Sequence, residues 1–296
     1  QYDSEFGFGK DILGFKSNWY GRLTGPFGDE LIPGAYLSRF SFFGLAFLIY
    51  KFEKNKYLNL YIVFYLCSVG LAIFASGERM ALSTFILGLF FMLVFFSNKK
   101  IIFAISIILL LLTIISVQKI HPYYNDYKVL ESTPLHLGLK VEKEYNCKDN
   151  LNLKCKKIIN LQPSFTKILK DFNISPYGEI YKLSLEMYKD HKILGIGLNN
   201  FTFLCEEDAR YNKIIKNYVC VSHPHNIYIQ WLVETGILGI FIFIIYLINI
   251  LLNLIKNFNE YSVISFSTIL VLFWPIMSTG SLLKNWNGVS TFLIIG

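Results

Sequence analysis

The residues with the clearest chemical potential stand where a polar segment gives way to a long apolar one. A His-Pro-His-Asn sequence at 223–226 ends the polar segment, and apolar residues follow at once. Pro224 disfavours helix at His223, and Asn226 is a good N-cap for a helix that starts after it. His225 would then lie at a helix N-terminus, whose dipole favours the neutral imidazole that a general base needs. The alternative is a histidine that only anchors the chain at a membrane surface.

Two arginines could supply positive charge beside such a base. Arg79 ends the short link 76–79 between two apolar stretches, and Arg39 lies inside a third. A planar guanidinium binds phosphate oxygens through two parallel hydrogen bonds, so two arginines at one membrane face would suit a lipid-borne diphosphate. Structural roles are also open, since Arg39 could pair with Glu234 or backbone carbonyls and Arg79 could reach headgroups. Glu234 would lie about 13 Å along the helix from His225 on the opposite face, where we expect it to brace helices.

Cysteines predict how the polar segment is held. Four of them lie in the stretch 119–225: Cys147, Cys155, Cys205 and Cys220. An even number suggests two disulfides if the compartment is oxidising, and sequence proximity favours Cys147–Cys155 and Cys205–Cys220. Four cysteines allow three pairings, and a zinc site is a further alternative.

The elements that must position these residues are apolar helices. Hydrophobic residues make up 53% of the chain, and six stretches are long enough to cross a hydrocarbon core, which takes roughly 20 helical residues. The stretches are 31–50, 57–77, 80–97, 101–118, 227–255 and 261–283, and a seventh is expected to start at Val289. The predicted fold class is an all-α polytopic membrane protein with about six to seven transmembrane helices. The chain opens with Gln1, and we interpret it as a fragment with both ends missing.

Charge predicts the topology of these helices. Lysines are dense in the short loops 51–56 and 98–100 and occur at Lys256, which the positive-inside rule puts in the cytoplasm. The chain then divides into three parts: 1–120, an external segment plus four helices; 121–225, a large periplasmic loop that is disulfide-bonded; and 226–296, the C-terminal helices. This bias accounts for most of the net charge of +7, and the absence of a basic stripe argues against nucleic-acid binding.

Within the loop, two local patterns are informative. Apolar residues between Glu179 and Tyr188 have the spacing of an amphipathic helix, which would lie on other protein or at the membrane surface. Gly195 and Gly197 indicate a tight turn rather than a dinucleotide site, because the third glycine is absent. The part 121–175 is interpreted as a variable loop.

Several of these motifs together resemble a known family. His225-Asn226, nine further residues and then Gly236-Ile237-Leu238-Gly239 are similar to the H-N-x9-G-x-x-G pattern of the O-antigen ligase and O-antigen polymerase superfamily. The link 76–79 resembles the family's S-G-x-R motif, and 195–201 resembles its G-x-G-x3-F turn. The segments 22–28 and 280–287 are similar as well, so that the resemblance extends from about residue 10 to 290.

The resemblance implies a metal-independent glycosyltransferase without a cofactor, in the bacterial inner membrane. It implies transfer of a glycan from undecaprenyl diphosphate, on the periplasmic side, to an acceptor hydroxyl on lipid A core, on another lipid-linked repeat or on a protein. His225 would be the general base and Arg79 would hold the diphosphate, with His223 and Asn226 as neighbouring substrate-binding candidates. The function expected first is O-antigen ligase, and the alternative is O-antigen polymerase. Candidates from other classes are a transporter of lipid-linked glycan and a receptor-like membrane protein.

One departure from the family pattern concerns a further arginine. Many ligases carry it near the start of the helix before the G-x-G turn, where this chain has Pro176-Tyr177-Gly178-Glu179. Arg39, Arg22 and Arg210 are the candidates to replace it, and the sequence does not choose among them.

Overall fold

The computed structural model describes residues 25–27, 32–120, 128–130, 139–146, 154–161, 169–215, 220–276, 280–283 and 285–295. After a 3-10 turn at Gly25–Phe27, the first helices are α1 (Pro33–Phe52), α2 (Leu58–Ala75), α3 (Arg79–Phe95) and α4 (Lys100–Ile120). The polar segment contains β1 (Lys128–Leu130), β2 (Leu139–Asn146), β3 (Lys154–Leu161), α7 (Pro176–Asp190), α8 (Phe201–Glu207) and α9 (Ala209–Asn212). The last helices are α10 (Ile227–Lys256), α11 (Glu260–Phe273) and α12 (Asn285–Ile295).

Helices α1 to α4 pack with α11 around one apolar core. Phe42 of α1, Leu66 of α2, Phe85 of α3 and Phe103 of α4 are all fully buried there. The rings of Phe91 and Phe266 stack between α3 and α11 with their centroids 4.4 Å apart. The sequence places α11 far from α3, and close packing of apolar side chains brings them together, as is usual for helices in a membrane.

Five of the six predicted spans correspond to helices α1, α2, α3, α4 and α10, and their number as membrane crossings stays a prediction. Within the described ranges, three helical segments are long and apolar enough to cross a bilayer, namely Leu58–Ala75, Ser97–Lys119 and Ile227–Lys256. Two shorter apolar helices are Arg79–Phe95 and Glu260–Phe273. The predicted stretch 261–283 is not one helix, because α11 ends at Phe273. Trp274 is extended, as expected before Pro275.

The polar segment adds a small sheet to this helical fold. Its strand order is β1-β2-β3 and both pairs are antiparallel, with Val129 opposite Val141 and Tyr145 opposite Cys155. The helical fold class is confirmed. The sheet lies in the part that the sequence analysis interpreted as a variable loop and was not anticipated.

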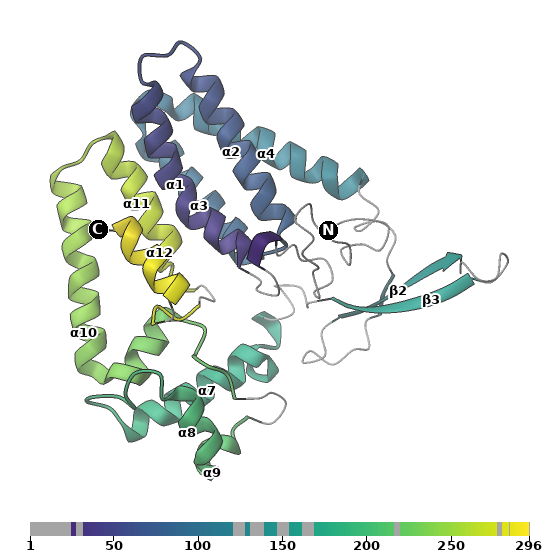
Figure 1. Cartoon of the computed structure of the whole chain (residues 1–296), viewed down its shortest axis with the longest axis vertical. Helices are drawn as coiled ribbons and strands as arrows, with labels where there is room; N and C mark the ends of the chain where they lie inside the picture. Colours follow the sequence, from purple (N-terminus) through teal and green to yellow (C-terminus); the bar gives the residue numbers. More distant parts are fainter. Residues whose placement is uncertain are drawn as a thin grey trace.

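Helices α7, α8 and α9 gather at the N-terminal end of α10, away from the loop between α1 and α2 (Figure 1). Ser175 caps α7 by accepting a hydrogen bond from the N–H of Gly178, and Pro176 follows at the position where a missing N–H costs nothing. Ile180, Leu183 and Met187 are buried on one face of α7 against Phe201 of α8, which confirms the amphipathic helix.

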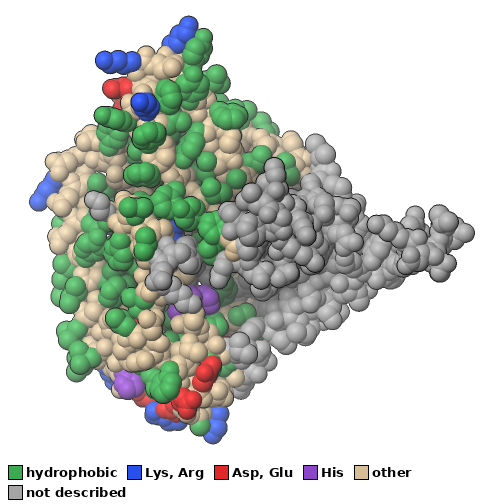
Figure 2. Space-filling model, viewed as in Figure 1, with side chains coloured by type: hydrophobic (Ala, Val, Ile, Leu, Met, Phe, Trp, Pro, Cys, Tyr) green, Lys and Arg blue, Asp and Glu red, His purple; other side chains and the backbone are tan. Residues whose placement is uncertain are grey.

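Charged side chains are distributed unevenly over the surface. On the face drawn in Figure 2, acidic and basic residues lie mainly at the two ends, and hydrophobic side chains occupy much of the broad zone between them. This distribution suits a protein whose middle faces lipid, because charged groups are costly within the hydrocarbon region.

Candidate functional site

His225 occupies an unusual backbone conformation at the start of α10. Its φ is +56°, one of two positive values among the described residues other than glycine. Its ring centroid lies 4.3 Å from that of His223 and 6.2 Å from that of Tyr177, which it meets edge to face. A positive φ at histidine is uncommon, and such conformations cluster at functional sites because the surrounding structure must hold them.

Asn226, the residue that follows this histidine, caps the start of α10 with its side chain. Its side-chain oxygen accepts hydrogen bonds from the N–H groups of Tyr228 at 3.0 Å and Ile229 at 3.2 Å, so it is the N-cap that the sequence predicts. Its amide nitrogen donates to the carbonyl of Pro275 at 2.8 Å. Asn226 is buried, and its hydrogen bond to Pro275 joins the start of α10 to the chain beyond α11.

His223 has a more enclosed environment than His225. Its side chain is buried, whereas that of His225 is half-buried. The hydroxyl of Ser222 lies 2.9 Å from Nδ1 of His223. The more accessible imidazole therefore belongs to His225, which is the position singled out by the family spacing.

Helix α7 brings two tyrosines to the histidines. Tyr177 meets His225, and Tyr181, one turn further along, forms a side-chain hydrogen bond with Asn226. Burial raises the pKa of Tyr181, and its neighbour Tyr177 adds to this effect. The stretch Pro176–Glu179 thus places an aromatic ring against His225.

Helix α10 is interrupted at Gly236, where φ is +66° and ψ is −167°. In an unbroken helix the N–H groups of residues 237 and 238 would donate to the carbonyls of residues 233 and 234. Instead the N–H of Ile237 donates to the backbone carbonyl of Lys192 at 2.9 Å, and the N–H of Leu238 donates to that of Ile193 at 3.4 Å.

The two carbonyls freed by this break are also bonded to the glycine turn. The N–H of Ile196 donates to Val233 at 2.9 Å and that of Gly197 donates to Glu234 at 3.0 Å. Gly195 and Gly197 both have positive φ, which confirms the predicted tight turn. The G-x-G turn and the G-x-x-G motif are therefore held together by backbone hydrogen bonds. We call this contact between residues 192–197 and 233–238 the joint.

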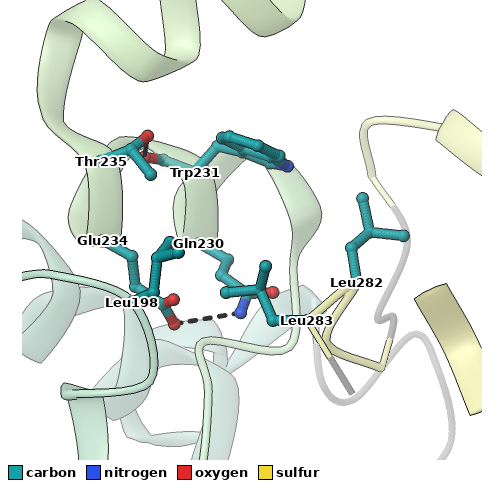
Figure 3. A pocket seen from close by; sticks show the side chains of 7 residues that line it. All are labelled: Leu198, Gln230, Trp231, Glu234, Thr235, Leu282 and Leu283. Carbon is teal, nitrogen blue, oxygen red and sulfur yellow. Dashed lines mark hydrogen bonds between the residues drawn. The ribbon is translucent and has the colours of Figure 1, made fainter. Parts of the chain in front are cut away.

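Glu234 supports this joint with its side chain. One carboxylate oxygen accepts the N–H of Asn199 at 3.1 Å, and the other accepts Nε2 of Gln230 at 3.0 Å. Gln230 also donates to the hydroxyl of Ser281 at 2.7 Å. Figure 3 shows Gln230 and Glu234 facing a small pocket, with Leu198 of the turn and Leu283 beside them. Glu234 thus braces the helix against the turn, and among the described residues its side-chain partners do not include Arg39.

Arg39 is a buried residue of α1 whose side chain reaches α12. Its guanidinium donates to the side-chain oxygen of Asn287, and Glu78 is near enough to interact with it electrostatically. Glu78 in turn accepts hydrogen bonds from the N–H groups of Gly34 at 2.7 Å and Ala35 at 3.0 Å, which caps the start of α1 from the neighbouring link.

These contacts bring two of the predicted arginines to one end of the bundle. Arg79 follows Glu78 directly and is the exposed first residue of α3, while Arg39 lies one turn beyond Ala35. The segment 275–287 contacts both this end and the start of α10, through Asn287 on Arg39, Ser281 on Gln230 and Pro275 on Asn226.

Arg210 has a different environment. Its guanidinium binds Asp190 at 3.1 Å and Asp208 at 2.8 Å on the surface of the loop helices. The hydrogen bonds from Arg210 lower the pKa of Asp208, and Asp208 raises the pKa of Arg210. Because two carboxylates already occupy this guanidinium, we leave Arg210 out of the proposed site. Arg22 lies outside the described residues.

The disulfide predicted nearest to the histidines is present. Cys205 and Cys220 are bonded with their Cα atoms 5.8 Å apart, and Cys205 is fully buried in the core of the loop helices. These two sulfurs are therefore not zinc ligands. Cys147 lies outside the described residues, and of Cys155 only the backbone is described.

Sequence reasoning missed four side chains that complete this region. Tyr181 had a detectable signal, since it lies on the predicted amphipathic helix, whereas Tyr177 lies before the start predicted for that helix. Gln230 and Ser281 lie in segments that resemble the family, but nothing in the sequence indicated their contact, because it joins two distant segments.

Comparison with known proteins adds one match. The family model described as O-antigen ligase matches residues 61–244, which include Arg79, the glycine turn, the histidine pair and the broken part of α10. No curated protein matches the chain.

Proposed function

Because the chain belongs to the O-antigen ligase family, we propose that it is a glycosyltransferase of the bacterial inner membrane. It transfers a glycan from undecaprenyl diphosphate to an acceptor hydroxyl on the periplasmic side, and lipid A core is the acceptor of a ligase. Membership of the family supports glycosyltransferase activity of the ligase or polymerase type, and the apolar helices support a membrane location.

The observation that carries the proposal is the setting of His225. The residue is held at positive φ between the capped start of α10 and the ring of Tyr177, and it is more accessible than His223. A conformation of this kind costs on the order of 1–3 kcal/mol and persists where the surrounding structure imposes it. A general base needs such fixed geometry, because its nitrogen must lie within hydrogen-bond reach of the acceptor hydroxyl.

The proposed reaction is a single displacement. Neutral His225 removes the proton of the acceptor hydroxyl while that oxygen forms a bond to the anomeric carbon of the donor sugar. The bond between this carbon and the diphosphate oxygen breaks, and undecaprenyl diphosphate leaves with the electron pair, which inverts the anomeric configuration. Arg79, together with Arg39, stabilises the negative charge that develops on the diphosphate.

Of the two arginines, Arg79 is the better candidate for direct contact with the donor. It is exposed at the end of the bundle, whereas Arg39 is buried and already donates to Asn287. Arg39 would then act as a fixed charge behind the diphosphate. The contacts of segment 275–287 with both Arg39 and the start of α10 support a shared site for the arginines and His225.

The test of the base is His225→Ala, measured as glycan transfer from a lipid-linked donor in reconstituted membranes. Loss of a general base lowers the rate by about 10²–10⁴-fold. The matched control is His191→Ala, which removes an exposed histidine at the end of α7 and should leave the rate unchanged. A wild-type rate for His225→Ala would refute the proposed role.

The test of the arginine is Arg79→Lys, which keeps the charge and removes the planar pair of donors. We expect weaker transfer with a raised KM for the donor, and a larger loss for Arg79→Ala. Arg210→Lys is the control, because that guanidinium binds carboxylates on the loop helices. Full activity of Arg79→Ala would assign Arg79 to anchoring alone.

Ligase and polymerase activities can be separated by the products of a deletion strain. Unattached full-length glycan would identify a missing ligase, and single repeats on lipid A core would identify a missing polymerase. Unchanged glycan would instead favour a receptor-like role, and accumulation of lipid-linked glycan on the cytoplasmic side would favour a transporter.

A further inference from the structure

The glycine turn presents apolar side chains to the outside. Ile193 is 64% exposed, Leu194 72% and Leu198 55%. Single exposed apolar residues need no explanation, but three on one short turn form a protruding apolar tip. The backbone of the turn is fixed by its hydrogen bonds to the break in α10, so this tip has a defined position.

The apolar tip adjoins the start of the apolar surface of α10. The carbonyl of Ile193 accepts the N–H of Leu238, and the side chains of Ile237 and Leu238 are 48% and 51% exposed. The apolar tip and the exposed apolar side chains of α10 therefore meet at the break.

The exposure of α10 changes at the same residue. All of its large apolar side chains that are exposed follow Gly236, from Ile237 to Ile255. The 20 residues from Ile237 to Lys256 span about 30 Å, which matches the hydrocarbon thickness of a bilayer. With Lys256 at one face of the membrane, Ile237 lies at the boundary of the other, and the part of α10 before Gly236 stands outside the hydrocarbon.

From this continuity we propose that the turn at 193–198 inserts Ile193 and Leu194 among the acyl chains of the outer leaflet, while Leu198, which lines the pocket beside Gln230 and Glu234, stays at the boundary. The partner of the apolar tip is thus the lipid bilayer. The polar residues beside the tip support this placement. Lys192 and Asn199 flank the tip and are exposed, as expected for residues at headgroup level beside an inserted apolar segment. Glu234, whose carbonyl accepts the N–H of Gly197, then lies just outside the hydrocarbon boundary, which revises the sequence interpretation of 227–255 as one span.

A bound polyprenyl chain is a less suitable occupant than the bilayer. A site for a single chain is a recess that buries most of the ligand, whereas Leu194 protrudes with nearly three quarters of its side chain exposed. The inserted tip would hold the joint at 233–238 at constant depth, and through it the part of α10 that begins after His225.

The experiment uses the unmodified full chain in vesicles of phosphatidylethanolamine and phosphatidylglycerol that contain a phospholipid with a diazirine on one acyl chain. No polyprenyl lipid or glycan is present, so the result does not depend on the proposed activity. After illumination, lipid adducts are mapped by mass spectrometry. We expect adducts in 193–198 at a yield similar to that in 237–248, and at least about tenfold above that in 206–213, which carries exposed charged residues.

Two results would overturn the inference. The first is labelling of 237–248 without labelling of 193–198, which would place the turn in water. The second is labelling of 193–198 only with a diazirine-bearing polyprenyl diphosphate and not with the phospholipid, which would assign the tip to a lipid ligand. Loss of labelling at 193–198 in a Leu194→Asp variant, with 237–248 still labelled, would support insertion further.

Discussion

Gly195 and Gly236 approach each other so closely that neither position has room for a side chain. A Cβ atom on Gly236 would lie 2.6 Å from the amide nitrogen of Gly195, and one on Gly195 would lie 2.6 Å from the carbonyl oxygen of Glu234. Both residues also have positive φ. The two glycine motifs are thus linked by a backbone contact, which explains why both need glycine at these positions.

Gly236 and Gly197 both have positive φ but should differ in their tolerance of alanine. We expect Gly236→Ala to lower the melting temperature of the purified protein strongly, because its backbone angles lie in a region almost restricted to glycine, at a cost on the order of 1–3 kcal/mol, and the added Cβ meets backbone that cannot move aside. Gly197→Ala is the matched comparison, since its Cβ would meet only the side-chain amide of Asn200, at 2.8 Å. Equal melting temperatures for the two variants would contradict the joint.

Glu234→Ala should loosen the turn while leaving α10 helical. The N–H of Asn199 would lose its acceptor, and Nε2 of Gln230 would retain only Ser281. Asn199 is exposed, so water can replace the lost carboxylate, and we expect a cost of about 0.5–1.5 kcal/mol, that of a typical hydrogen bond. Faster amide hydrogen exchange at 195–200 measures the effect, and Glu207→Ala, which removes an exposed carboxylate, should show none.

Asn226 can be separated into its two roles by a pair of variants. Asn226→Asp keeps the oxygen that caps α10 but loses the donor to Pro275, whereas Asn226→Ala loses both. We expect Asn226→Ala to be less stable in thermal unfolding, by about 0.5–2 kcal/mol for the cap. If transfer activity falls in Asn226→Asp without loss of stability, the contacts of the side-chain amide with Pro275 and Tyr181 serve the site; equal stability of the two variants would contradict capping.

Tyr177 should matter through its ring rather than its hydroxyl. Its edge-to-face contact orients the imidazole of His225, so Tyr177→Phe should transfer glycan at nearly the wild-type rate and Tyr177→Ala should lower kcat by about tenfold, equivalent to 1.4 kcal/mol of transition-state stabilisation. Leu185→Ala, at an exposed position of the same helix, controls for changes to α7. A wild-type kcat for Tyr177→Ala would exclude the positioning role.

What the sequence predicts well is local. Asn226 caps α10 because a cap acts on the next two or three residues, and Gly195 and Gly197 form a turn because few other residues tolerate their backbone angles. The helix at 179–188 follows from the spacing of its own apolar residues. The Cys205–Cys220 pair follows from proximity along the chain.

What the sequence does not predict depends on distant contacts. The break in α10 lies inside the stretch 227–255, which hydropathy indicates as one span and where a glycine is compatible with a helix, and only the turn some 40 residues earlier reveals it. The partner of Arg39 is Asn287 rather than Glu234, because packing of α1 against α12 decides which polar side chain is within reach. Pro275 ends α11, although hydropathy extends the apolar stretch to 283.

The bonding of the glycine turn to the break in α10 has a consequence for biosynthesis. A broken helix exposes backbone donors and acceptors that an apolar environment cannot satisfy. The turn that satisfies them precedes α10 in the chain and so emerges from the ribosome first. The glycine turn is therefore synthesised before the break in α10. Because of this order, the backbone groups left by the break can bond to the turn as soon as α10 is made.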